Sequence, residues 1–98
     1  MQLRTHRFLT NESAQGAEST YLTDFRFNDI PDRTIQGVLL DGAEVSIFTY
    51  LDKEDDTVAH LVGTFSDPSF STVIQGPVAR IQVVKSNTAG TASVEGLV

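Results

Sequence analysis

The sequence EVSIFTYL at positions 44–51 decides the fold class, because its side chains alternate strictly along the chain. One set of alternate positions holds Val45, Ile47, Thr49 and Leu51, and the other holds Glu44, Ser46, Phe48 and Tyr50. A period of two residues is the period of a β-strand whose two faces meet different surroundings. The segment therefore predicts a strand with one buried face.

The same alternation recurs along the rest of the chain. It is clearest at 21–27, 57–65 and 78–84, and shorter β candidates lie at 3–9, 34–40, 70–74 and 92–98. Turn-forming residues separate these segments at 28–32, 41–42, 52–56, 66–68, 75–77 and 86–90. Short strands at this spacing are typical of a sandwich or barrel. We predict an all-β, antiparallel β-sandwich, jelly-roll-like, with about eight short strands. Segment 11–19 is predicted to be a surface loop with at most a short helical turn.

Length and composition limit the architecture further. The chain has 98 residues, which fits one domain over 1–98. A chain of this size buries only about 65% of its unfolded surface, so a partner subunit would help to stabilise its thin core. It has no apolar run of the length needed to cross a bilayer, so we expect no membrane association. It has no cysteine, which excludes disulfides and thiolate metal sites.

The charge is acidic and unevenly distributed. Seven Lys and Arg face thirteen Asp and Glu, for a net charge of −6. Nucleic-acid binding requires clustered cations, so this balance argues against a nucleic-acid partner. Residues 1–10 hold Arg4, His6 and Arg7 and no acid. They predict either a basic N-terminal arm that reaches an acidic neighbour or an edge strand with a solvated end.

No pattern in the sequence predicts catalysis or metal binding. The acidic segment 52–56 lacks the glycine and the final bidentate acid of an EF-hand, so a solvated hairpin loop is the better interpretation than a calcium site. His6 and His60 have no paired ligand spacing, and no Gly-x-Ser-x-Gly motif occurs. We therefore predict a protein that is not an enzyme and has no cofactor and no metal.

Three aromatic residues stand out as candidate contact residues. Phe48 and Tyr50 share a strand face with Glu44 and Ser46, and Phe70 lies among small polar residues. Such rings can anchor a subunit interface or stack on sugars. They can equally be buried on both faces of a small sandwich, and the sequence leaves these alternatives open for Phe48 and Tyr50. For Phe70, a core or interface position is favoured over a sugar platform.

The end of the chain has a recognisable pattern. Positions 74–84 read IQGPVARIQVV and positions 87–98 read NTAGTASVEGLV. This combination resembles the closing hairpin of small β-sandwich virion proteins of tailed bacteriophages: a Gly-Pro turn, an apolar strand, a Gly/Thr turn and a Thr-Ala-x-Val-x-Gly-Leu ending. Gln82 departs from that pattern, in which arginine is commoner after the isoleucine. The resemblance covers only 74–98, and its motifs recur in many β-proteins.

The resemblance implies a structural role in a virion. It suggests a capsid decoration (cement) protein on the outer surface of the capsid, which forms a homotrimer and binds the major capsid protein or other virion proteins. The alternatives are a minor head-tail or tail component, or a carbohydrate- or receptor-binding sandwich module. The acidic charge fits the outside of a shell better than a surface that faces packaged DNA. The interface residues predicted for this role are Arg4 and Arg7, as ion pairs between subunits, and Phe48, Tyr50 and Phe70, as apolar anchors.

Overall fold

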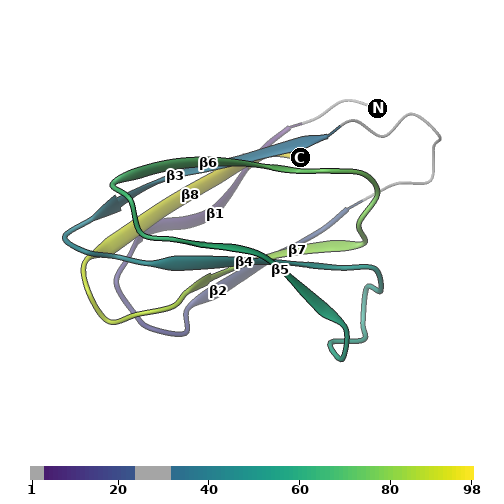
Figure 1. Cartoon of the computed structure of the whole chain (residues 1–98), viewed down its shortest axis with the longest axis horizontal. Helices are drawn as coiled ribbons and strands as arrows, with labels where there is room; N and C mark the ends of the chain where they lie inside the picture. The colour runs from purple at the N-terminus through teal and green to yellow at the C-terminus, as the bar shows by residue number, and fades with distance from the viewer. Residues whose placement is uncertain (1–3, 24–31) are drawn as a thin grey trace.

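The described part of the chain folds into a β-sandwich of eight strands (Figure 1). The structure is a computed structural model that describes residues 4–23 and 32–98. The strands are β1 (Thr5–Glu12), β2 (Glu18–Leu22), β3 (Arg33–Leu40), β4 (Val45–Tyr50), β5 (Ala59–Phe65), β6 (Ser69–Ile74), β7 (Arg80–Lys85) and β8 (Thr91–Leu97). The described residues include no helix long and apolar enough to cross a membrane.

The strands form two antiparallel sheets. The first sheet has the order β1-β8-β3-β6, and the second has the order β2-β7-β4-β5. The pairs β1·β8, β2·β7, β3·β6 and β4·β5 are those of one long antiparallel ribbon folded over on itself, and the pairs β3·β8 and β4·β7 join the ribbon into sheets. This is the strand order of the eight-stranded jelly roll. The predicted fold class is therefore confirmed.

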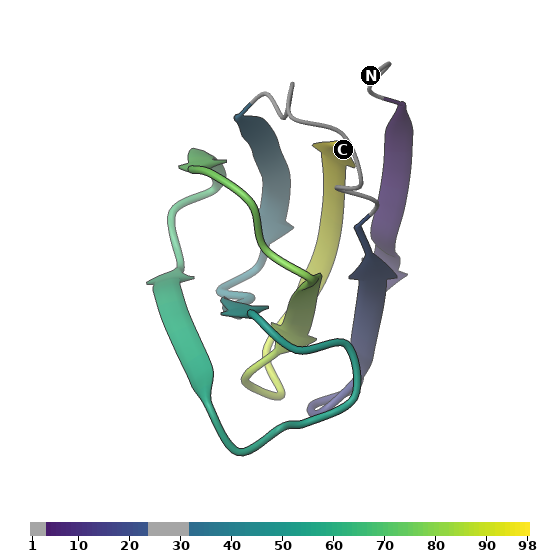
Figure 2. The same cartoon turned by 90° about the vertical axis from the view of Figure 1, so that its right-hand side faces the viewer.

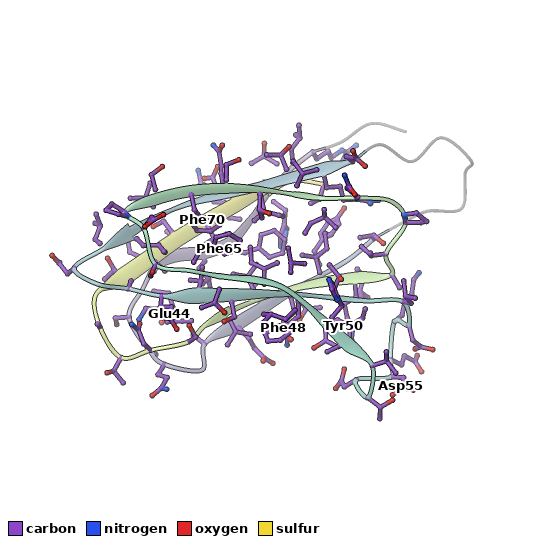
Figure 3. All side chains as sticks on the ribbon, viewed as in Figure 1. Glu44, Phe48, Tyr50, Asp55, Phe65 and Phe70 are labelled. Carbon is purple, nitrogen blue, oxygen red and sulfur yellow. The ribbon has the colours of Figure 1, made fainter. Side chains whose placement is uncertain are left out.

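The core lies between the two sheets and consists of the inward-facing residues of every strand. Its fully buried members include Ile35, Val45, Ile47, Ile81, Val83 and Val94. Phe65 and Phe70 stack between the sheets with ring centres 4.5 Å apart (Figure 3). Phe70 fits there because its cross-strand neighbour is Gly37, where an added Cβ would lie 2.7 Å from the ring of Phe70.

A buried lysine closes one end of the sandwich. Lys85 ends β7 with its side chain facing inward and no exposed surface. Its ammonium donates to the backbone oxygens of Asn87 and Ala89, both at 2.7 Å, and to Oδ1 of Asn87 at 2.9 Å. Three oxygen acceptors use the three ammonium donors, which offsets the cost of burying the charge. Lys85 therefore organises loop 86–90, which carries the chain from the second sheet to the first.

The structure corrects several details of the sequence-based prediction. Segments 78–84 and 92–98 do not form a closing hairpin, because β7 and β8 belong to different sheets. The predicted loop at 11–19 is shorter, because β1 continues to Glu12 and β2 begins at Glu18. Leu51 does not continue the buried face of β4 and is largely exposed. The later part of the strand predicted at 21–27 and most of the turn at 28–32 lie outside the described residues.

Candidate interaction surface

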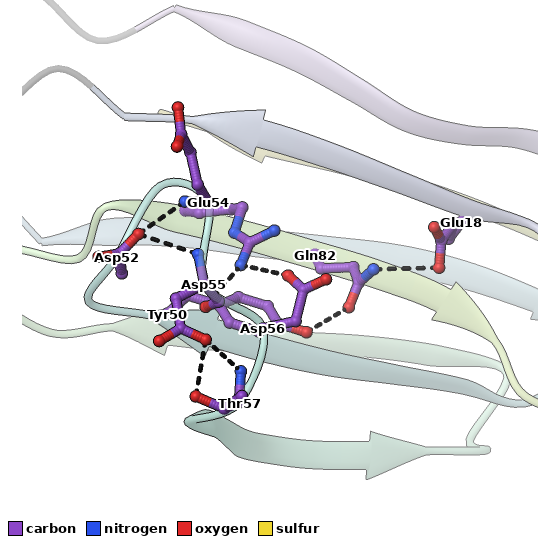
Figure 4. Close-up of polar contacts among 9 residues, drawn as sticks. Glu18, Tyr50, Asp52, Glu54, Asp55, Asp56, Thr57 and Gln82 are labelled. Carbon is purple, nitrogen blue, oxygen red and sulfur yellow. Dashed lines mark hydrogen bonds and ion pairs between the residues drawn. The ribbon is translucent and has the colours of Figure 1, made fainter.

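The outer face of the second sheet carries a connected set of polar side chains (Figure 4). The hydroxyl of Tyr50 donates to Oε1 of Gln82 at 2.7 Å, and the amide of Gln82 donates to Oε2 of Glu18 at 3.0 Å. Arg80 lies flat on the Tyr50 ring, with its Cζ 3.9 Å from the ring centre, a cation–π contact. These contacts bury Tyr50 and leave little of the Arg80 side chain exposed.

Arg80 also attaches the acidic loop between β4 and β5 to this face. Its guanidinium lies 2.6 Å from a carboxylate oxygen of Asp56 and donates to the backbone oxygen of Asp55 at 3.2 Å. The loop is ordered further by its own carboxylates. Backbone N–H groups of Glu54 and Asp55 donate to Oδ1 of Asp52 at 2.7 and 2.9 Å, and the hydroxyl and N–H of Thr57 donate to Oδ1 of Asp55 at 2.6 and 2.9 Å.

These hydrogen bonds make the loop sensitive to acid. Bonds from the Glu54 and Asp55 N–H groups hold the pKa of Asp52 below its ordinary value of 3.8, and the bonds from Thr57 lower the pKa of Asp55 in the same way. A carboxylate whose pKa is lowered by folding contributes stability above its ordinary pKa, and this stability is lost as the pH falls through the lowered value.

We expect the double substitution Asp52→Asn and Asp55→Asn to reduce the acid sensitivity of folding. The free energy of unfolding of the wild type should fall more steeply than that of the variant below about pH 4. Denaturant titrations at a series of pH values measure both slopes. Glu54→Gln removes one charge from the same loop without these bonds and serves as the control. Equal slopes for the wild type and the double variant would contradict the assignment.

The outer face of the first sheet differs in character. The pairing register places its outward-facing side chains in rows that run across β1, β8, β3 and β6. One row is Thr5, Leu97, Thr34 and Val73; the next is Arg7, Glu95, Gln36 and Ser71; the third holds Ser93, Val38 and Ser69; and the last holds Thr91 and Leu40. Val38, Leu40, Val73 and Leu97 are each about half exposed. A polar row thus crosses a face that is otherwise rich in exposed apolar side chains.

Two shallow hollows lie on this face and share its central residues. One, of about 410 Å³, includes Ser71 and Ser93 in its lining, and the other, of about 370 Å³, includes Thr34 and Leu97. Gln36 and Glu95 line both. The hollows are open to solvent and polar at their centre, so a partner side chain or a hydroxyl-rich ligand could fit them.

The same face has no net charge in a chain whose net charge is −6. Within the rows described above, the ionised side chains are those of Arg7 and Glu95, whose Nε and Oε1 atoms lie 3.4 Å apart. Both are well exposed, so this pair contributes little to stability. It does cancel charge locally. The first sheet therefore presents a neutral surface, whereas carboxylates border the outer face of the second sheet.

The five predicted interface residues are scattered over the molecule. Tyr50 is buried under Arg80, and Phe70 is buried in the core, so neither ring is available at the surface of the chain. Phe48, on the outer face of the second sheet, is partly exposed. Arg4 is exposed, and its backbone oxygen accepts the N–H of Val98 at 2.9 Å. Arg7 is paired within the chain rather than free for a neighbour.

Sequence reasoning missed the apolar side chains of the first sheet's outer face. Val38 and Leu40 alternate in phase with the polar residues Thr34 and Gln36, which is the signal that could have revealed two apolar side chains facing solvent.

Within residues 4–23 and 32–98, no three His, Asp or Glu side chains are grouped closely enough to hold a metal ion.

The chain was compared with protein families, curated proteins and solved structures. No protein family, curated protein or solved structure matches the chain.

Proposed function

We propose that this chain is a non-enzymatic structural protein of a phage particle, which decorates the outside of the capsid and stabilises it through repeated surface contacts. The observation that carries the proposal is the neutral outer face of the first sheet, with its four half-exposed apolar side chains. Exposed apolar side chains that gather on one face of a small domain favour a contact surface there. In an acidic chain, a neutral face is also the surface that can approach another acidic surface at the least electrostatic cost.

Two further arguments support a virion role. The jelly roll is a fold that viral capsid proteins share with lectin domains and cupins. Residues 74–98 resemble the end of small phage virion proteins, although this similarity now spans β7 and β8 of two different sheets rather than a hairpin. Repetition of a modest contact over many copies converts weak binding into strong attachment, so a small domain suits this role.

The proposal predicts that a charge placed on the neutral face abolishes attachment. Val38→Glu should weaken binding to particles assembled without this chain at least about tenfold, because an unpaired carboxylate would be buried at the contact. Leu22→Glu is a matched control: Leu22 is 56% exposed and Val38 is 49% exposed, but Leu22 lies on the outer face of the opposite sheet. Co-sedimentation with particles measures binding, and the melting temperatures of both variants should remain close to that of the wild type.

A glycan array, set beside the particle-binding experiment, separates the proposal from the carbohydrate-binding alternative. That alternative rests on the polar lining of the hollows, in which Gln36 and Glu95 could bind sugar hydroxyls. It predicts that the isolated chain binds glycans on an array and that Gln36→Ala removes this binding. Glycan binding without particle binding would overturn the decoration proposal, as would equal particle binding by the Val38→Glu and Leu22→Glu variants.

A further inference from the structure

Among the strands that the structure describes, four lie at the edges of the two sheets, and three of these are protected against pairing with another chain. An exposed edge presents unpaired N–H and C=O groups, and proteins block it with charges, bulges or short strands. Strand β1 carries Arg7 and Glu12 and has two register shifts. Strand β2 is only five residues long and begins with Glu18. Strand β5 has a register shift opposite Ile47 and Phe48.

Strand β6 has none of these protections. It pairs with β3 over its whole length without a register shift, and its sequence, SFSTVI, contains no charged residue and no proline. Among the described strands, β3 is the one that pairs with β6, and the opposite edge of β6 pairs with no described strand. It is thus a regular, uncharged edge next to the neutral face of the first sheet.

The hydrogen-bond pattern shows which groups of β6 face outward from this edge. The N–H of Leu39 donates to the backbone oxygen of Pro68 at 2.9 Å, so these two residues form a hydrogen-bonded pair. In an antiparallel ladder, hydrogen-bonded pairs alternate with pairs whose N–H and C=O groups point away from the partner strand. Phe70, Thr72 and Ile74 therefore bond to β3. The N–H and C=O groups of Ser69, Ser71 and Val73 point to the free edge.

Charge indicates what can occupy this edge. Strands β5 and β6 form one side of the sandwich, opposite β1 and β2 (Figure 2), and neither contains Asp, Glu, Lys or Arg. A basic partner would be drawn instead to the carboxylates elsewhere on this acidic chain. A second copy, itself of net charge −6, avoids like-charge contacts best at this neutral side. The occupant that the charge favours is therefore another copy of the chain.

We propose that β6 pairs with β6 of a second copy, antiparallel about a twofold axis at Ser71. This register places Ser71 opposite Ser71 and Ser69 opposite Val73, so that residues facing the free edge meet each other. Three such pairs make about six backbone hydrogen bonds. The two first sheets become one eight-stranded sheet, and their neutral outer faces join into one surface. The contact consists of one pair of edge strands and belongs with small, transient interfaces, so the dimer should form at micromolar rather than nanomolar concentration.

This inference does not depend on the proposed function, because it concerns the isolated chain. A twofold contact forms a dimer rather than the trimer implied by the virion resemblance, so the mass in solution distinguishes these two expectations.

The test is sedimentation velocity of the wild type from about 10 µM to 1 mM, alongside three variants of Ser71. Ser71→Pro removes the central outward N–H, and an edge strand tolerates proline where the N–H faces solvent. Ser71→Lys keeps the backbone but sets two like charges opposite each other at the axis. Ser71→Ala keeps both the N–H and the neutrality. We expect a monomer–dimer equilibrium for the wild type and Ser71→Ala, and dissociation constants at least about tenfold larger for Ser71→Lys and Ser71→Pro.

Ionic strength provides an independent readout. Two copies of charge −6 repel each other, and salt screens that repulsion, so dimerisation through a neutral edge should strengthen between 20 and 300 mM NaCl. Contacts made by ion pairs would weaken instead. A monomer at every concentration would overturn the proposal, as would an oligomer whose mass is unaffected by Ser71→Lys. If Ser71→Pro fails to fold, Ser71→Lys still tests the contact by itself.

Discussion

Replacement of Gly90 by alanine should destabilise the protein by about 3–5 kcal/mol, through left-handed backbone strain together with a steric clash. Gly90 has a φ of +60° in the loop between β7 and β8, a conformation that L-residues with a Cβ rarely adopt. An added Cβ would lie 1.7 Å from the backbone oxygen of Leu40 and 2.9 Å from the backbone of Asp41. Neither neighbour is the end of a flexible side chain, so the two loops would have to separate.

Gly16→Ala is the control that separates the backbone strain from the steric clash. Gly16 also has a positive φ, of +84°, but an added Cβ there would meet nothing within 4 Å. Its substitution should cost only about 1–2 kcal/mol, the cost of the left-handed conformation alone. Denaturant unfolding of both variants measures the difference. Equal losses at the two positions would show that the close approach of Gly90 to Leu40 does not constrain the fold.

Lys85→Met should cost about 3 kcal/mol, because it removes a buried donor group and leaves its acceptors unsatisfied. Methionine retains most of the apolar stem but cannot donate to the oxygens of Asn87 and Ala89. In a domain of this size, such a loss should lower the melting temperature by about 12–24 °C.

Lys53→Met serves as the control for this change. Lys53 is exposed in the acidic loop, and its replacement should change stability by less than about 0.5 kcal/mol. Thermal unfolding followed by circular dichroism compares the two variants. A Lys85→Met protein as stable as the Lys53→Met protein would show that the buried ammonium does not stabilise loop 86–90.

Both predictions concern loop 86–90, where sequence-based reasoning was accurate locally and wrong about topology. The Gly-containing turn before the last strand was predicted, and Gly90 does adopt a positive φ. The resemblance to virion proteins implied a hairpin of segments 78–84 and 92–98, which the structure does not form. In the jelly roll, this loop instead crosses between the sheets, and the inward-facing Lys85 donates to backbone oxygens of the loop. A lysine at the end of a strand would ordinarily be placed at the surface.

The fold class was predictable because alternation is a local property of the chain. Positions 44–51 and 78–84 alternate clearly, and β4 and β7 are the central, most buried strands of the second sheet. Partner strands were not predictable, since pairing such as β1 with β8 joins opposite ends of the chain. For the same reason, the sequence could not show that β6 is an edge.

The candidate surface was harder to predict than the fold. For Tyr50 the sequence left a buried and an exposed position open, and the ring is buried because Arg80 of the adjacent strand covers it. For Phe70 the sequence favoured a core or interface position, and Gly37 opposite leaves room for its ring in the core. Both outcomes depend on the cross-strand neighbour. The neutral face likewise follows from four strands that are distant in the sequence.

Saturation binding of the purified chain to phage particles assembled without it tests the central claim of a capsid decoration role most directly. We predict a fixed ratio of bound copies to capsid subunits at saturation, with ordered density for the chain on the outer surface of the shell in cryo-electron microscopy. Decorated particles should also release their DNA at a higher temperature than bare particles, because binding to the assembled state stabilises that state. Binding that does not saturate, or no binding at all, would contradict the proposal.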